Sequence, residues 1–294
     1  MPAGHVDCGQ VREAHIVLCG GRELAYADLG RPGGPCVFFF HGAPMSRLHL
    51  VPLEEQFAAR GLRVISPDRP GYGRSSPQPG RSLSDWPADV TGLADALGLD
   101  RFLVAGHSSG GAYAVACAAL LAARVRAGIV LGGVTDMAWP ASWSGYLEGR
   151  VEIGAMRAPD EDAARAVCAA HFGEDGSGFF DDSFEWPEPD LALLSDESVG
   201  KALTSAVVEA FRQGIGAYAQ DVYLEGQGWP FDAQGIEVPV EVVHGELDTL
   251  VPVAHSHHTA ALIPGATLRL PPGHGHLTTL SMLPEIAAGL ARID

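Results

Sequence analysis

Residues 106–110 read Gly106-His107-Ser108-Ser109-Gly110, a G-x-S-x-G sequence between an apolar run and a run of small residues. The apolar run 101–106 predicts a buried strand, and the run 109–123 predicts a helix. A serine on so tight a strand-to-helix turn needs neighbours without side chains two positions away on either side. The stretch therefore predicts a nucleophilic Ser108 above a sheet edge, with the Ser109 amide aimed at a bound acyl oxygen.

A serine hydroxyl is a weak nucleophile, so this turn requires a histidine base and an orienting acid elsewhere in the chain. Two histidines, His274 and His276, follow the last predicted strand, and either could be the base. For the acid, Asp248 follows the predicted strand 240–244 and competes with Asp136 and Glu246. We favour Asp248, which lies just past the carboxyl end of that strand, and Ser108, Asp248 and His276 then follow one another in the order serine, aspartate, histidine. Asp136 reads alternatively as a helix N-cap.

Around the turn, strand-like and helix-like segments alternate regularly. Two short β-like runs, 14–18 and 24–28, flank Gly20-Gly21 and predict an antiparallel hairpin. The pattern then predicts buried strands at 36–40, 62–66, 101–106, 127–132, 240–244 and 267–270, and helices at 48–60, 84–97, 109–123, 253–262 and 279–292. This order predicts an α/β fold with a mostly parallel sheet and helices on both faces.

The alternation stops between residues 135 and 228, where Phe and Trp residues mix with acidic ones. We interpret 135–228 as an inserted helical cap and residues 1–134 and 229–294 as the core. The cap aromatics, Trp139 and Trp143 among them, could line an apolar pocket or pack the cap onto the core. His41, Gly42 and His107 are further candidates for the substrate pocket.

Taken together, the chain resembles the serine hydrolases of the α/β-hydrolase superfamily over nearly its whole length. His41-Gly42-Ala43-Pro44 resembles the HGxP oxyanion segment of that family, and residues 68–75 are similar to its D-x-x-G-x-G-x-S loop. The resemblance implies the α/β-hydrolase fold and an oxyanion hole formed by the amides of Ala43 and Ser109. It favours His276 over His274, because the family pattern is Gly-His followed by an apolar residue, as in Gly275-His276-Leu277.

Composition limits the partners of this 294-residue chain. It has 19 Lys+Arg against 36 Asp+Glu and a net charge of -17, which disfavours nucleic acid and anionic membranes. No apolar export signal precedes residue 15, so we expect a cytoplasmic protein whose five cysteines are reduced. His255, His257 and His258 have metal-ligand spacing, but a solvated helix face is the favoured interpretation. We expect no metal and no cofactor, and the sequence does not indicate an oligomeric state.

The leading hypothesis is hydrolysis of an ester, thioester or related acyl bond of a small, partly apolar substrate. Ser108, His276 and Asp248 would act as nucleophile, base and orienting acid. Alternatives on the same three residues are carbon–carbon hydrolysis, acyl transfer, cofactor-free haloperoxidase chemistry and lyase chemistry. Dehalogenases and epoxide hydrolases are disfavoured, because their nucleophile at this turn is Asp. A non-catalytic ligand-binding protein on the same scaffold is the alternative from a different class.

Overall fold

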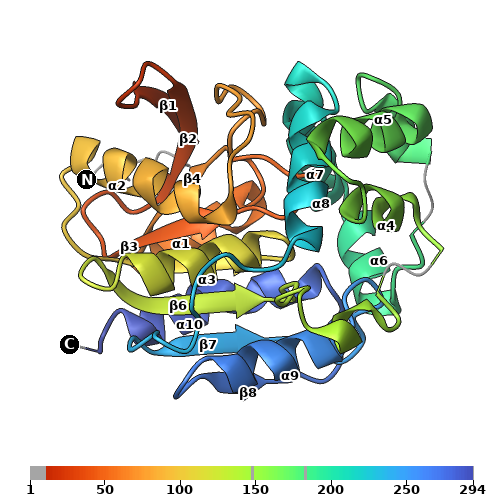
Figure 1. Ribbon diagram of the computed structural model, residues 1–294. Helices are drawn as coiled ribbons and strands as arrows, with labels where there is room; N and C mark the ends of the chain where they lie inside the picture. Colours follow the sequence, from red (N-terminus) through yellow and green to blue (C-terminus); the bar gives the residue numbers. More distant parts are fainter. Residues whose placement is uncertain (1–10, 147–148, 182–183, 294) are drawn as a thin grey trace.

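The computed structural model describes residues 11–146, 149–181 and 184–293, and it confirms the α/β-hydrolase fold expected from the sequence. Eight strands form one sheet in the order β1-β2-β4-β3-β5-β6-β7-β8 (Figure 1). Strand β1 pairs with β2, and β2 with β4, in antiparallel register, while all other pairs are parallel. The strands are Arg12–Val17, Glu23–Gly30, Cys36–Phe40, Arg63–Pro67, Phe102–His107, Val125–Leu131, Val240–Val243 and Thr267–Arg269, numbered β1 to β8.

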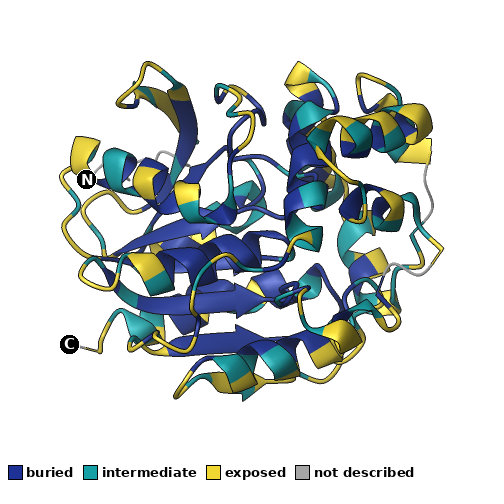
Figure 2. Ribbon diagram, viewed as in Figure 1, coloured by how far each residue is buried: buried dark blue, intermediate teal, exposed yellow. Residues whose placement is uncertain are grey.

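The central strands are covered on both faces, as their uninterrupted apolar runs predict (Figure 2). All residues of β3 and β5 are buried. Alternate side chains enter different cores, because successive side chains of a strand point to opposite faces. Val37 and Phe39 pack into one hydrophobic cluster, whereas Phe38 and Phe40 pack into the other.

Helices α1 (Glu54–Ala59) and α10 (Leu283–Leu290) cover one face of the sheet, and α2 (Trp86–Ala96), α3 (Gly110–Leu120) and α9 (Val253–Leu262) cover the other. Two predicted helices are shorter than expected. The segment 48–60 begins with turns and a 3-10 helix at Val51–Leu53, and 279–292 divides into the 3-10 helix Thr278–Met282 and α10. Pro52 and Pro284 each lie in the first turn of a new helix, where the missing N–H removes no hydrogen bond.

Among the described residues between β6 and β7, five α-helices lie over the carboxyl ends of the strands, and we keep the name cap for this segment (Figure 1). They are α4 (Val151–Met156), α5 (Glu161–Phe172), α6 (Glu188–Ser195), α7 (Glu197–Ala210) and α8 (Gly216–Gly226). The same segment contains 3-10 helices at Pro140–Trp143, Ser177–Asp181 and Phe211–Gln213, and a further 3-10 helix, Leu83–Asp85, precedes α2 in the core. The cap has its own hydrophobic cluster, which includes Phe172, Phe211 and Tyr218. Asp136 joins the two ends of the insertion, because its Oδ1 accepts from the amides of Ala138 and Trp229, both at 3.0 Å.

No helix in the described part of the chain is long and apolar enough to span a bilayer. Within the same ranges the cysteines Cys19, Cys36, Cys117 and Cys168 carry free thiols, and Cys8 lies outside the described residues.

Candidate active site

Ser108 lies in the turn that joins β5 to α3, with a backbone φ of 55°. It is the one non-glycine residue with positive φ in the described ranges, so the turn is strained there. A Cβ on Gly106 would lie 2.0 Å from the Gly110 carbonyl oxygen, and a Cβ on Gly110 would lie 2.1 Å from the Phe40 carbonyl oxygen. These contacts explain why both positions must be glycine.

The segment after β3 lies directly beside this turn. A Cβ on Gly42 would lie 3.2 Å from the Ser108 Cβ, so the two loops touch. Ala43 and Ser109 both border the cavity that contains Ser108. Within residues 11–146, 149–181 and 184–293, neither of their amides donates a hydrogen bond to another protein group. Both N–H groups are therefore available to an oxyanion at Ser108.

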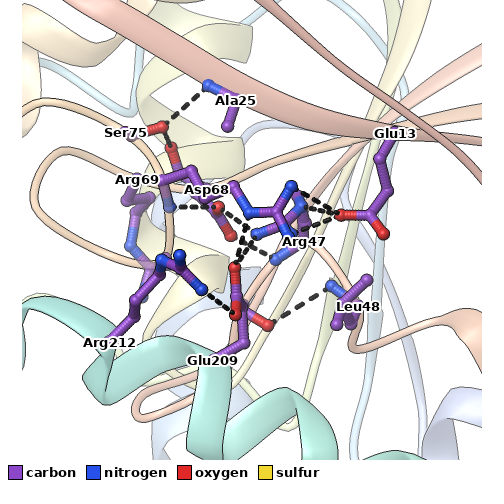
Figure 3. A network of polar contacts seen from close by, with 12 residues as sticks. Glu13, Ala25, Arg47, Leu48, Asp68, Arg69, Ser75, Glu209 and Arg212 are labelled. Carbon is purple, nitrogen blue, oxygen red and sulfur yellow. Dashed lines mark hydrogen bonds and ion pairs between the residues drawn. The ribbon is translucent and has the colours of Figure 1, made fainter.

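A buried ion-pair network holds the loop 68–75 against this segment (Figure 3). Asp68 accepts from the Arg47 amide at 2.6 Å and from the Arg47 guanidinium at 2.7 Å. Arg47 also binds Glu209 of cap helix α7 at 2.8 Å and Glu13 of β1. A Cβ on Gly73 would lie 2.1 Å from Asp68 Oδ2, which explains the glycine five residues after the aspartate. The network joins the oxyanion segment to the cap.

His41 lies behind the oxyanion segment, fully buried. Its Nε2 accepts from the Arg69 amide at 3.2 Å, so its Nδ1 carries the proton and donates to the Gly42 carbonyl at 2.8 Å. Burial and the nearby Arg69 charge keep the pKa of His41 well below its usual value. Arg69 in turn binds Asp221 of cap helix α8 at 2.8 Å. His41, a candidate for the substrate pocket, therefore supports the loop from behind and is not among the residues that border the cavity.

The structure places His276 against Asp248. Nδ1 of His276 donates to Asp248 Oδ2 at 2.7 Å, while Asp248 Oδ1 accepts from the amides of Leu250 and Val251 at 2.8 and 3.0 Å. Burial favours the neutral acid, but His276 and these donors outweigh it and lower the pKa of Asp248 to about 2. Burial also lowers the pKa of His276, yet the Asp248 carboxylate outweighs it and raises that pKa above its usual value. The pair leaves His276 Nε2 as a basic nitrogen.

The competing candidates lie elsewhere. His274 does not border the cavity, and its Nδ1 bonds the Pro272 carbonyl at 3.1 Å. Asp136 connects the two ends of the cap through its hydrogen bonds to Ala138 and Trp229, and Glu246 is exposed at the surface. A second buried histidine, His244, approaches Asp248 Oδ2 at 3.4 Å, but it bonds Ser256 and the Val251 carbonyl instead of facing the cavity.

A cavity of about 300 Å³ lies between the core and the cap and contains Ser108 and His276 in its wall. Two candidates for the substrate pocket, Gly42 and His107, also border it, as do Ala43 and Ser109, the residues expected to form the oxyanion hole. The cap aromatics divide: Phe179, Phe180, Phe184 and Trp186 border the cavity, whereas Trp139 and Trp143 do not. For the last two, the sequence left pocket lining and cap packing both open, and in the structure they lie outside the cavity wall. Trp139 stacks on His258 at 4.1 Å, and Trp143 lies under Arg157.

Sequence patterns missed several cavity residues. His49 is buried beside His107, at 5.3 Å between ring centroids, and neither of its nitrogens has a hydrogen-bond partner in the described structure. Burial and neighbouring histidines lower the pKa of His49, so it is neutral. Of His49 and His107, only His107 belongs to a sequence motif, the turn around Ser108. Its Nε2 donates to the His276 carbonyl at 3.0 Å. No local signal points to His49, since it lies on an irregular segment.

The cap contributes further polar residues to the cavity wall that no motif announces, namely Tyr146, Glu152, Tyr218 and Glu225. His255 also departs from expectation. It was interpreted as part of a solvated helix face, but it is buried and donates to the Ser142 carbonyl at 2.7 Å, so it fastens the start of the cap. No group of three or more His, Cys, Asp or Glu side chains in the described ranges is arranged to hold a metal ion.

Comparisons with known proteins identify the family and support the fold. The sequence model described as the alpha/beta hydrolase family matches residues 37–288. A non-heme chloroperoxidase of Streptomyces lividans is 30% identical over 90% of this chain and 94% of its own length. A bifunctional esterase/perhydrolase of Acinetobacter calcoaceticus is 28% identical over 90% of this chain and 94% of its own. The solved esterase of Thermogutta terrifontis superposes with a TM-score of 0.67 at 21% identity, covering 95% of this chain and 96% of that one.

Proposed function

The chain belongs to the alpha/beta hydrolase family, and from this premise we propose that it is a cofactor-free serine hydrolase that cleaves an ester, thioester or related acyl bond. The observation that carries the proposal is the combination of a strained Ser108 with a His276–Asp248 pair in the wall of one cavity. The substrate class is small, because the cavity holds only about 300 Å³. Its aromatic cap wall favours a partly apolar substrate.

Acylation begins when Ser108 Oγ attacks the carbonyl carbon of the substrate and His276 Nε2 takes the hydroxyl proton. Asp248 holds the ring through Nδ1 at 2.7 Å and stabilises the imidazolium that forms. The amides of Ala43 and Ser109 donate to the oxyanion of the tetrahedral intermediate. His276 then protonates the leaving alcohol or thiol, which departs and leaves an acyl-Ser108 ester.

Deacylation repeats these steps with water as the nucleophile. His276 deprotonates a water molecule as it attacks the acyl carbonyl, and the same two amides receive the charge. Collapse of this intermediate returns the proton to Ser108 Oγ and releases the acid. One lost oxyanion donor typically costs about 3 kcal/mol of transition-state stabilisation. The two amides therefore provide a substantial part of the proposed rate enhancement.

The first prediction tests the nucleophile. Ser108→Ala removes the attacking oxygen while keeping the fold, so turnover of short p-nitrophenyl esters should fall by a factor of about 10⁴ or more. Initial rates of nitrophenol release measure this loss. Ser109→Ala is the matched control, since it removes the neighbouring hydroxyl but keeps the amide, and it should retain most of the activity. A Ser108→Ala variant that turns over esters at the wild-type rate would exclude the mechanism.

A second candidate activity, perhydrolysis, is favoured by the names of two relatives, a chloroperoxidase and an esterase/perhydrolase. In it, hydrogen peroxide replaces water in the attack on acyl-Ser108, giving a peracid and free serine. It needs no residue beyond those named above. Iodometric detection of peracid from an ester and peroxide tests it, and loss of peracid in Ser108→Ala separates enzymatic perhydrolysis from background oxidation.

A further inference from the structure

The cap end of the cavity carries a polar cluster in a wall that is otherwise largely aromatic and aliphatic. We call Glu152, Glu225, Tyr146 and Tyr218 the cap cluster; all four border the cavity. None of them has a part in the proposed acyl chemistry, which uses groups of the core. A buried polar cluster costs free energy unless its groups find partners. Because the cap cluster lies in the wall of a substrate cavity, a bound ligand would supply the partners that its groups lack.

Glu152 is the clearest sign of a missing partner. Its side chain belongs to α4 and the residue is only 4% exposed. Oε1 accepts from the Tyr218 hydroxyl at 3.0 Å and from Arg150 at 3.3 Å. Oε2 is buried and has no hydrogen-bond partner in the described parts of the chain. A carboxylate oxygen can only accept while the acid is ionised, so the vacant position fits a donor group.

Glu225 adds a second acceptor from α8. The Tyr146 hydroxyl donates to its Oε1. Burial and the nearby carboxylates of Asp221 and Glu152 raise the pKa of Glu225 to about 7, against the opposing Tyr146 hydrogen bond. A cation placed beside this carboxyl would favour its ionised form and gain binding energy from it. An uncharged donor would gain less.

The two helices approach each other closely beside these carboxyls. Gly226 follows Glu225, and a Cβ on it would lie 2.3 Å from the Met156 carbonyl oxygen of α4. The absence of a side chain at this position lets α8 reach the helix that carries Glu152. The two carboxyls lie near enough for the charge of Glu152 to contribute to the raised pKa of Glu225. They therefore act on one region of the cavity.

The surroundings favour a cation. Residues 135–228 hold 18 of the 36 acidic side chains but only five of the 19 Lys+Arg, so the cap attracts positive charge. Phe179 and Trp186 border the same cavity, and the faces of aromatic rings attract cations. Arg150 balances part of the charge of Glu152, which leaves Glu225 without a basic hydrogen-bond partner in the described ranges.

We propose that the cap cluster is a subsite for a positively charged amino group of the substrate, with Glu152 and Glu225 as its acceptors. The proposal deepens the function above and rests on it, because it describes the substrate of the same cavity. The substrate is then an acyl compound whose reacting bond lies at Ser108 and whose ammonium group lies at the cap. The apolar wall between the two ends contacts its hydrocarbon part.

Direct binding of simple probes tests this subsite. Isothermal titration calorimetry compares hexylammonium with 1-hexanol on the whole protein, since a primary amine with a pKa of about 10.4 is charged at neutral pH. Hexylammonium should bind about tenfold tighter than hexanol, as expected for a charge-assisted hydrogen bond. Glu152→Gln and Glu225→Gln keep the shape of the wall, and each should reduce this preference several-fold while leaving hexanol binding unchanged.

The control variant is Asp162→Asn, which removes one acidic charge from the exposed surface of the cap. It should keep the full ammonium preference, and circular dichroism of all variants verifies folding. Hexanol binding as tightly as hexylammonium would overturn the subsite, and so would a preference that survives in both Gln variants. Calorimetry needs no turnover, so a protein that binds hexylammonium in this way but hydrolyses no ester would contradict the proposed function alone.

Discussion

At the scale of single residues, the turn around Ser108 depends on its glycines. A side chain at these positions would collide with nearby backbone carbonyl groups. A methyl group at Gly110 would meet the Phe40 carbonyl at 2.1 Å, and backbone atoms cannot move aside as a flexible side chain can. The strain at Ser108 is therefore held by its neighbours.

Gly110→Ala should consequently lower the free energy of unfolding by about 3 kcal/mol or more, as overpacking against backbone does. Urea denaturation followed by circular dichroism measures the change. Gly289→Ala is the matched control, because a Cβ at this exposed position of α10 meets nothing within 4 Å. The control should gain about 0.5 kcal/mol, as Ala is the better helix former. Equal effects of the two substitutions would contradict the steric explanation.

The His276–Asp248 pair predicts the pH dependence. The base must be neutral to accept a proton, and Asp248 raises the pKa of His276 above its usual value of 6.5. For an uncharged ester, kcat/KM should therefore fall as the pH drops through a midpoint above 6.5. Asp248 should not add a second step near neutral pH, because its pKa is about 2.

Asp248→Asn supplies the comparison for this profile. Without the carboxylate, burial dominates, so the midpoint should move below 6.5 as kcat falls by several orders of magnitude. Glu246→Gln, at an exposed neighbouring position, should leave the profile in place. A midpoint that stays where it is in Asp248→Asn would mean that another group titrates.

At the scale of elements, cap helix α8 is joined to the core by a buried carboxylate. Asp221 binds Arg69 at 2.8 Å, accepts from the Tyr113 hydroxyl at 2.7 Å, and pairs with Arg81. Burial alone would raise the pKa of Asp221, but Arg69 and Arg81 hold it well below its usual range. Both guanidinium groups are buried and depend on this charge.

Asp221→Asn should therefore destabilise the protein by about 3–5 kcal/mol, the typical effect of leaving buried charges unpaired. The midpoint of urea unfolding measures this loss. Asp162→Asn, which removes an exposed acid from the same cap, should change the stability by no more than about 0.5 kcal/mol. A small effect at Asp221 would show that the two arginines find other partners.

Sequence patterns revealed those elements whose constraints are local. The apolar runs of β3 and β5 and the glycines around Ser108 can each be recognised within a short window of sequence. Asp248 and His276 can also be recognised, because each follows a predicted strand. For the cap aromatics the sequence left pocket lining and cap packing both open, and in the structure Trp139 and Trp143 do not border the cavity. Composition says that a segment is apolar, but the packing of helices far apart in sequence decides which ring faces the cavity.

The cap cluster is a second feature that local sequence patterns do not reveal. Glu152 and Glu225 are separated by 73 positions, and neither has a neighbour in sequence that marks it as buried. Acidic residues on helices usually face water, so the sequence alone favours solvent-exposed positions for Glu152 and Glu225. Only the close approach of α4 and α8 at Gly226 brings the two carboxyls to one cavity wall.

At the scale of the whole molecule, the proposed mechanism takes its reacting groups from the core and the groups that would choose the substrate from the cap. Ser108, His276 and Asp248 belong to the sheet-and-helix core, whereas Glu152 lies on α4, Tyr218 and Glu225 lie on α8, and Tyr146 precedes α4. Figure 1 shows α4 and α8 on the side of the sheet where the strands end. The ion pair of Arg47 with Glu209 connects the two parts (Figure 3), and so does the buried ion pair of Arg69 with Asp221. Substitutions in the cap should accordingly alter substrate preference, and those in the core should alter the rate for every substrate.

The most direct measurement is covalent labelling with a fluorophosphonate, followed by mass spectrometry of the intact protein and its peptides. An activated serine displaces fluoride and keeps the phosphonyl group, so we predict one adduct per chain, located on Ser108 and absent from Ser108→Ala. His276→Ala should label far more slowly, because the base is gone. An unlabelled folded protein, or an adduct on a different residue, would contradict the assignment of Ser108 as the nucleophile.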